Sequence, residues 1–291
     1  MHQLSFSTEI INTEIINTEI INTEIIDTEV TDTEAIDTEI IDSKKPDGKA
    51  DLAKTNDHSK KAIAIHKLLC QEYGCPIPYF HDLDPLSELV SSLLSHRTKN
   101  KDSGSAFKQL RAAFPTWEAV CDADTEAVQR AIAPCTWPEQ KAPRIQQILK
   151  QITADRGELS INFLADISVS EARAWLEQLA GVGPKTSAAV LSFSTLRRRA
   201  LPVDSHHHRV AIRTGLIPPK VSVGPSHALL EAQLPPEWNA QQVYDNHEVM
   251  MLHGQQCCHY RQPKCDRCSL IALCPHGQTY AKPHSNFRTS T

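Results

Sequence analysis

The sequence lacks any long apolar run: no segment reaches the roughly 18 to 20 apolar residues that a membrane-spanning helix needs. Aromatic residues are scarce, at 5% of 291 residues, although the hydrophobic fraction of 40% is ordinary. Residues 1–10 lack the basic and apolar segments of a secretory signal. We therefore expect a soluble, cytoplasmic protein without a membrane partner, long enough for two modest domains.

Basic residues are missing from the N-terminal region, and this absence conceals the charge of the remaining chain. Eleven acidic residues and no Lys or Arg lie between Glu9 and Asp42. The formal charge of the whole chain is −5, but the rest of the chain has 24 acidic against 30 basic residues, a net charge of about +6. That sign suits contact with the phosphates of a nucleic acid.

Residues 8–42 repeat a five-residue unit, TEIIN, which drifts to TEIID and DTEAI. This period matches neither a helix, with about 3.6 residues per turn, nor the two-residue alternation of a strand, so no single face becomes buried. We interpret the repeat as an acidic tail without stable structure, with pairing of Ile-rich segments into β-structure as the alternative. Residues 44–61 then form a linker, so that residues 1–61 and a short tail at 284–291 lie outside the folded part.

The pattern becomes helical from residue 62 on, and no convincing strand pattern interrupts it. The candidate helices are 62–72, 86–97, 106–114, 125–133, 141–154, 170–179, 184–194, 205–214 and 239–252. Two of them begin with suitable N-terminal chemistry, namely Asp84-Pro85 and Ser170-Glu171. The sequence therefore predicts an all-α fold.

Four of the nine cysteines crowd into a short segment near the C-terminus. Gaps of six, two and five residues separate Cys258, Cys265, Cys268 and Cys274. Without a secretory signal, this pattern favours a metal site over disulfides, because four thiolates in a tight loop can converge on one centre. The spacing alone leaves open an iron-sulfur cluster or a structural zinc site with four cysteines. Cys257 is out of step with the spacing, so we give it no ligand role.

The segment LAGVGPKTS, residues 179–187, places two glycines in a turn between two apolar, helix-like segments. Gly181 and Gly183 let the backbone approach a ligand closely, and Pro184 suits the first turn of a helix. Backbone N–H groups at such a helix start form a cradle for phosphate. An ordinary helix-turn-helix corner is the alternative for this segment taken alone.

The segment VDSHHHRV follows at residues 203–210. Asp204 suits the N-cap of the next helix, or an acid with a chemical role. The three consecutive histidines do not predict a metal site, because adjacent helical positions point about 100° apart and cannot converge on one ion.

In order and spacing, LAGVGPKTSAAVL, VDSHHHRV and the cysteine loop resemble the endonuclease III family over residues 62–276. The resemblance implies a two-domain helix-hairpin-helix DNA glycosylase fold with a C-terminal [4Fe-4S] loop. In this reading residues 85–199 form a six-helix domain, and residues 62–84 combine with 200–283 in an iron-sulfur domain, with the DNA-binding cleft between them. The implied function is base excision repair with AP lyase activity, removing damaged bases such as oxidised pyrimidines from double-stranded DNA. We expect a monomer associated with the nucleoid.

By this resemblance, Lys185 attacks the sugar, Asp204 is essential, and the four spaced cysteines hold the cluster. An amine must be unprotonated to attack C1′, and the N-terminal end of a helix lowers the pKa of an ammonium group. A carboxylate can take the amine's proton and stabilise positive charge on the sugar. The alternatives are a monofunctional mismatch glycosylase, which commonly lacks the lysine, and a non-catalytic helix-hairpin-helix DNA-binding protein.

The resemblance also implies DNA contacts from the hairpin glycines, Thr186, His206 and Arg209. One departure concerns Arg97, in LLSHRTKN, where family members typically read LLSAQATD with a Gln that fills the gap left by the flipped base. Arg has more donors and a longer reach, so we expect the substrate range or the opposing base to differ. Trp137 aligns with the loop that wedges into the duplex, although a core position also suits a Trp.

Overall fold

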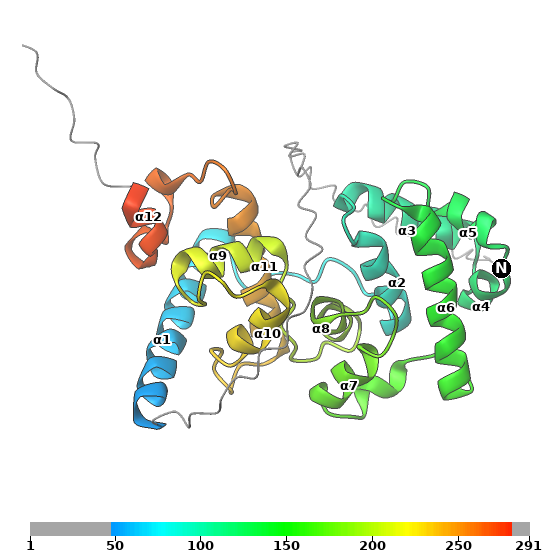
Figure 1. Cartoon of the computed structure of the whole chain (residues 1–291), viewed down its shortest axis with the longest axis horizontal. Coiled ribbons are helices and arrows are strands. Elements are labelled where there is room, and N and C mark those ends of the chain that lie inside the picture. Colours follow the sequence, from blue (N-terminus) through cyan, green and yellow to red (C-terminus); the bar gives the residue numbers. More distant parts are fainter. Residues whose placement is uncertain (1–47, 281–291) are drawn as a thin grey trace, which may run out of the picture. The chain divides into compact units, whose positions relative to one another are not determined.

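The described part of the chain is entirely helical. The structure is a computed structural model that describes residues 48–280, with side chains from residue 57 on. Every regular element in this range is a helix (Figure 1), which confirms the all-α fold. None of these helices is long and apolar enough to cross a membrane. The chain divides into the units Met1–Lys45 and Pro46–Thr291, and the acidic repeat and the tail at 284–291 lie outside the described residues.

The α-helices of this range are α1 Gly48–Tyr73, α2 Pro85–Ser95, α3 Asn100–Ala113, α4 Trp117–Asp122, α5 Thr125–Ala131, α6 Pro138–Arg156, α7 Val169–Leu176, α8 Pro184–Phe193, α9 Ser205–Thr214, α10 Val223–Glu231, α11 Ala240–Gln256 and α12 Pro275–Tyr280. Short 3-10 helices are η1 Asn162–Ala165, η2 Cys265–Arg267 and η3 Ile271–Leu273.

The largest difference from the predicted helices lies at the start of α1. This helix begins at Gly48, so residues 48–61, which we interpreted as a linker, are helical. Ala and Lys recur in this stretch, and both are strong helix formers. Helices α4, α10 and α12 were not predicted, because each has nine residues or fewer and shows little apolar periodicity.

The residues at which α2 and α7 begin are set by side chains that cap the helix N-terminus. The Asp84 side chain accepts hydrogen bonds from the first turn of α2, as predicted. For α7 the predicted start is two residues late, because Ser168 rather than Ser170 is the N-cap. Ser168 Oγ accepts from Glu171 N at 3.2 Å, and Glu171 Oε2 accepts from Ser168 N at 3.0 Å, which completes a capping box.

Buried apolar side chains form two main clusters. The larger lies between Leu86 and Ala200, on α2 to α8. The second joins α1 to α9, α10, α11 and the cysteine loop, and Figure 1 shows these helices together on one side. Because all described residues, 48–280, belong to one compact unit, the predicted domain boundaries near residues 85 and 200 stay a prediction.

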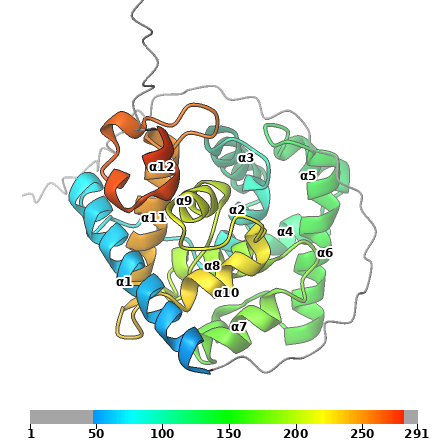
Figure 2. The same ribbon diagram turned by 60° about the vertical axis from the view of Figure 1, so that its left-hand side comes forward.

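Helix α9 lies near the centre of the described fold (Figure 2). It packs against α10, α11 and α12, and α11 also packs against α8. The α9–α11 approach is close at Gly254, where an added Cβ would lie 2.7 Å from His206 Cβ. Glycine at this position therefore allows α11 to fix the start of α9.

Candidate active site and cysteine loop

The turn between α7 and α8 presents backbone to the outside. Gly181 has a φ of +80°, a left-handed conformation that favours glycine, and an added Cβ would lie 3.0 Å from Arg144 Cδ. Gly183 is the N-cap of α8, and a Cβ added there would meet no described atom within 4 Å. The start of α8 is therefore open to a ligand, as a phosphate cradle requires.

Lys185 lies in the first turn of α8, directly after Pro184. Burial lowers its pKa, whereas the carboxylates of Asp204 and Glu88 act in the opposite direction. The structure thus brings Lys185 and Asp204, the two residues predicted to be catalytic, close enough to interact electrostatically. The Lys185 amine makes no hydrogen bond within residues 57–280, so only the charges of Asp204 and Glu88 favour its ammonium form.

Asp204 is the N-cap of α9, and its Oδ1 accepts a hydrogen bond from the backbone N–H of His207 at 2.7 Å. Burial acts to raise its pKa, but the nearby histidines, His247 first among them, and the hydrogen bond from the His207 N–H act in the opposite direction, so the pKa lies below its usual value. The carboxyl group is therefore ionised at neutral pH. The N-cap role and a chemical role are compatible in this geometry.

Buried ionisable groups that sequence analysis missed surround Asp204. The rings of His207 and His247 are stacked, with centroids 5.8 Å apart, and both side chains are buried. Burial lowers the pKa of His207 to about 3 and that of His247 to about 4, so both rings are neutral at pH 7. Burial, together with Asp204 and Asp245, raises the pKa of Glu248 to about 7.

A second carboxylate interacts with Lys185 from α2. Glu88 is only 3% exposed, and its Oε1 accepts a hydrogen bond from Ser92 Oγ at 2.8 Å. Its Oε2 lies 3.0 Å from His81 Nε2. The Lys185 amine therefore interacts with carboxylates from two helices. Sequence analysis missed Glu88, although an acidic residue inside the apolar stretch 86–94 is a signal that could have identified it.

The predicted DNA contact from Thr186 needs a correction. Its side chain is 2% exposed, and its Oγ1 lies 2.9 Å from His96 Nε2. Thr186 therefore faces the protein, because α2 packs against this side of α8, and any DNA contact from this position falls to the backbone. Burial, with Lys185 and other cations nearby, lowers the pKa of His96 to about 4, so this ring is neutral.

A buried lysine on α6 braces the loop that follows α2. Lys141 Nζ donates hydrogen bonds to Leu94 O at 2.7 Å, to His96 O at 2.8 Å and to Thr98 Oγ1 at 2.8 Å. Thr98 Oγ1 also accepts from Thr136 N at 3.1 Å. These bonds fix the loop that carries Arg97 to the loop that precedes α6.

Arg97 and Trp137 lie together on these two loops. Their φ angles are 51° and 54°, which is uncommon for residues other than glycine. The Arg97 guanidinium lies 6.0 Å from the centroid of the Trp137 ring, and Trp137 is 46% exposed. A core position for Trp137 is thereby excluded. Strained backbone of this kind gathers at functional sites.

Arg209 and His206 make contacts within the protein. Arg209 Nε donates to Cys258 O at 2.9 Å, and its Nη2 donates to Gly254 O at 2.7 Å and lies 3.0 Å from His206 Nδ1. Arg209 therefore joins α9 to the cysteine loop, which the sequence did not predict. DNA contacts from these two residues stay a prediction.

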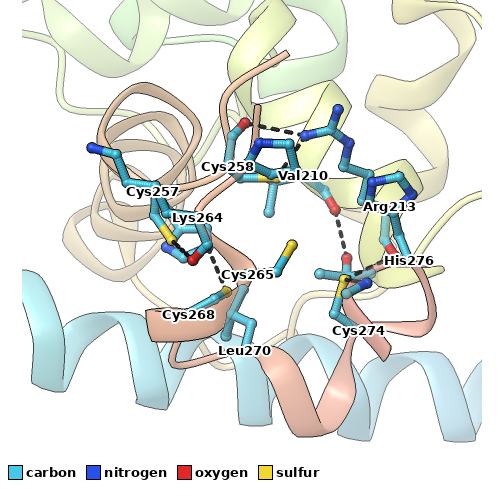
Figure 3. A pocket seen from close by; sticks show the side chains of 14 residues that line it. Val210, Arg213, Cys257, Cys258, Lys264, Cys265, Cys268, Leu270, Cys274 and His276 are labelled. Carbon is cyan, nitrogen blue, oxygen red and sulfur yellow. Dashed lines mark hydrogen bonds between the residues drawn. The ribbon is translucent and has the colours of Figure 1, made fainter. Parts of the chain in front are cut away.

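The four spaced cysteines line one pocket beyond α11. Figure 3 shows, around a central hollow, the side chains of Cys258, Cys265, Cys268 and Cys274. Two of the sulfurs accept N–H groups: Arg213 Nη1 lies 3.2 Å from Cys258 Sγ, and Gly277 N lies 3.2 Å from Cys274 Sγ. Hydrogen bonds to sulfur stabilise thiolates and tune iron-sulfur clusters. This donor set therefore fits a group held by four thiolates.

Two other cysteines form a disulfide, Cys70–Cys75, at the end of α1. Sequence analysis proposed no disulfide in this chain. The cysteines lie five positions apart, and Gly74 between them has a φ of +80°, which turns the chain back after the helix. A glycine between two closely spaced cysteines is the sequence signal that could have indicated this disulfide.

The family model described as "HhH-GPD superfamily base excision DNA repair protein" matches residues 90–236. The matched range includes the α7–α8 turn, Lys185 and Asp204, and it ends before the cysteine loop.

Individual relatives match a larger part of the chain than the family model does. The chain is 32% identical over 212 residues to a putative DNA glycosylase of Arabidopsis thaliana, covering 73% of this chain and 71% of the relative. It is 29% identical over 217 residues to endonuclease III of Haemophilus influenzae, covering 74% of this chain and 95% of the relative. A solved non-covalent endonuclease III–DNA complex has a TM-score of 0.65 at 22% identity, over 76% of this chain and 97% of that chain.

Proposed function

The chain belongs to the HhH-GPD superfamily of base excision DNA repair proteins and has an endonuclease III-like fold, and we propose from this premise that it is a DNA glycosylase with associated AP lyase activity. The observation that carries the lyase step is Lys185, partly buried in the first turn of α8 and interacting with Asp204. The proposed substrates are damaged bases in duplex DNA, with oxidised pyrimidines first among them.

Duplex binding is proposed to use the backbone at the start of α8. A Cβ added at Gly183 would meet no described atom within 4 Å, so the start of α8 is open, and the N–H groups of this first helical turn can donate to a DNA phosphate. The part of the chain after the acidic repeat is positively charged, which favours phosphate contact at low salt. The damaged nucleotide must leave the base stack to reach Lys185, because C1′ is inaccessible inside a duplex.

The chemistry proposed for Lys185 begins with the neutral amine. Its lone pair forms a bond to C1′ while the bond from C1′ to the base breaks, and the base leaves with that electron pair and takes up a proton. Asp204 accepts the proton that the attacking nitrogen loses, and it stabilises positive charge on the sugar. Ring opening gives a Schiff base, loss of a C2′ proton expels the 3′ phosphate, and water then releases Lys185.

We further propose that a [4Fe-4S] cluster is held by Cys258, Cys265, Cys268 and Cys274, whose side chains surround one pocket. Such a cluster crosslinks the loop and gives it a fixed shape. The loop carries Arg261 and Arg267, both exposed, as candidate phosphate contacts. Protein purified without oxygen from iron-replete cells should be brown and contain about four irons per chain. Colourless protein from such cells would contradict this assignment.

The test of the lyase proposal is borohydride trapping on duplexes that carry a panel of lesions or an abasic site. The wild type should form a covalent protein–DNA adduct, because borohydride reduces the Schiff base. Lys185→Gln should bind the duplex as tightly but form no adduct, whereas Lys220→Gln, at an exposed lysine, should trap like the wild type. Trapping by Lys185→Gln would identify another nucleophile. If the wild type releases bases but traps on no substrate, the protein is a monofunctional glycosylase.

A further inference from the structure

The closest set of metal-binding atoms in the cysteine loop is not the set of four spaced cysteines. The ligand atoms of His253, Cys257 and Cys268 all lie within 4.8 Å of one another. His253 is 1% exposed and Cys257 is 6% exposed, so these donors are turned away from solvent. Two of the three residues lie outside the spaced set and have no part in the proposed cluster.

The spacing of these atoms suits one tetrahedral ion. With Zn–N near 2.0 Å and Zn–S near 2.3 Å, the nitrogen and sulfur of a tetrahedral site lie roughly 3.6 Å apart. His253 Nε2 lies 3.4 Å from Cys268 Sγ. Cys257 Sγ lies within 4.8 Å of both atoms, so it reaches a common ion with a small movement. Imidazole and thiolate together are ligands that zinc prefers.

The other ring nitrogen of His253 is already held in place. Nδ1 lies 3.2 Å from the Tyr73 hydroxyl oxygen and 3.9 Å from Glu72 Oε2. Glu72 Oε2 in turn accepts a hydrogen bond from Ser269 Oγ at 2.5 Å. Zinc-binding histidines almost always have such a partner on the second nitrogen, because it fixes the ring and makes the first nitrogen a better ligand. The surroundings of His253 thus match those of a metal ligand.

Cys257 has no other evident function. It caps the C-terminus of α11, and its Sγ lies 3.6 Å from Lys264 O, a long contact for a thiol donor. Cys257 lines the same pocket as the spaced cysteines, and in Figure 3 its side chain lies at the edge of it. The four spaced cysteines already supply four thiolates to the proposed cluster, which leaves Cys257 without a role in it.

We propose that the cysteine loop binds a single zinc ion through His253, Cys257 and Cys268, as an alternative to the iron-sulfur cluster. Cys268 belongs to both ligand sets, so the two metals exclude each other. Water completes the four-coordinate site. Zinc keeps the loop folded when iron is scarce. The proposal is independent of glycosylase activity, and it stands even if the loop never takes up iron.

The test compares the full chain from iron-replete cells with the full chain from iron-limited, zinc-supplemented cells, with both metals measured by elemental mass spectrometry. Wild-type protein from the second culture should hold about one zinc per chain. Cys257→Ser should lose the zinc but keep the cluster, and Cys258→Ser should lose the cluster but keep the zinc. The matched control is Cys121→Ser, a free cysteine on α4, which should change neither metal.

X-ray absorption at the zinc edge of the wild type gives a second readout that needs no substitution. We expect mixed coordination with one imidazole nitrogen and two sulfurs. A shell of four sulfurs would overturn the proposal in favour of a four-cysteine zinc site, as would zinc content unchanged in Cys257→Ser. Wild-type protein without zinc would also overturn it. Absence of iron from every culture contradicts only the cluster, and the zinc result is read separately.

Discussion

Lys141 on α6 and Lys185 on α8 lie on two helices that both pack against α2; Lys141 is buried and Lys185 is partly buried. Burial lowers the pKa of each amine. Their surroundings otherwise differ. Lys141 donates to three oxygens at 2.7 to 2.8 Å, whereas Lys185 makes no hydrogen bond within the side chains described.

This difference separates a structural lysine from the lysine that we propose to be reactive. An ammonium group has three N–H donors and a neutral amine has two, so Lys141 cannot lose its proton without leaving an acceptor unsatisfied. Lys185 loses no hydrogen bond when it is deprotonated, and its carboxylate neighbours can accept the proton. Burial alone therefore does not make a lysine a nucleophile. The amine must also be free of hydrogen bonds that hold it in the ammonium form.

The largest effect is expected at the acid that interacts with Lys185. Asp204→Asn keeps an N-cap oxygen for α9, because Asn caps helices about as well as Asp, but it removes the negative charge. Base release under single-turnover conditions should fall by roughly two orders of magnitude or more. Circular dichroism should show an unchanged helical fold. Near wild-type release by this variant would remove Asp204 from the proposed mechanism.

The free energy of unfolding should depend on Lys141 and not on Lys185, whereas the proposed chemistry depends on Lys185. Lys141→Met removes the three hydrogen bonds that the amine donates to Leu94 O, His96 O and Thr98 Oγ1, so the free energy of unfolding should fall by about 3 kcal/mol, at roughly 1 kcal/mol for each bond. Lys185→Met removes an amine without a hydrogen bond, and the free energy of unfolding should stay constant or rise. Urea unfolding of both variants measures the difference. Equal destabilisation by the two substitutions would contradict the distinction.

The loop that Lys141 braces should influence which base is accepted opposite the lesion. Arg pairs best with guanine, through O6 and N7, whereas Gln pairs best with adenine, through N6 and N7. Arg97→Gln should therefore lower the ratio of kcat/KM opposite guanine to that opposite adenine by roughly tenfold. The exposed Arg130 on α5 supplies the control, Arg130→Gln. If Arg97→Gln changes the ratio of kcat/KM no more than Arg130→Gln does, Arg97 contacts phosphate and does not read the opposing base.

The smallest effect concerns the buried histidines near Asp204. The pKa of His207 falls from 6.5 to about 3 on folding and that of His247 to about 4, so the unfolded chain binds more protons below about pH 6.5. The contribution of these two neutral rings to the free energy of unfolding is therefore fully present above that pH, and it declines as the pH falls toward 4. Each ring contributes a slope of about 1.4 kcal/mol per pH unit.

His207→Phe keeps an aromatic ring against His247 and removes one titrating group. The free energy of unfolding, measured in urea at several values between about pH 7 and pH 5, should depend less steeply on pH in this variant by that single-ring slope. An unchanged slope would show that His207 takes up its proton in the folded protein without loss of stability.

Local chemistry decided which features were predictable from the sequence. The LAGVGPKTS turn placed Lys185 correctly in a helical first turn, and Asp84 and Asp204 were identified as helix caps, because these signals act over a few residues. The inward orientation of Thr186 was missed, because it depends on His96, which is 90 positions away in the chain. The periodicity of α8 alone does not reveal which neighbour covers each face.

The grouping of Glu88, Lys185 and Asp204 was missed in part for the same reason. Their helices lie far apart in the sequence and meet only through the packing of α2, α8, α9 and α11. Cys257 was set aside because it is out of step with the spacing of the other cysteines, and a rule that compares cysteines along the chain does not consider His253. The third donor of their site, Cys268, lies 15 positions beyond His253, across the cysteine loop.

Helix α9 also has a mechanical property. Asp204 stands at its N-cap, while Arg209 Nε donates to Cys258 O at 2.9 Å and Arg213 Nη1 donates to His259 O at 2.6 Å. Its ten residues form a stiff rod roughly 15 Å long, fastened through these arginines to the cysteine loop. A change in the shape of the loop, such as an exchange of the two proposed metal centres would bring, would therefore be passed along the rod to Asp204. The metal in the loop would then set the position of the acid, without transfer of any electron.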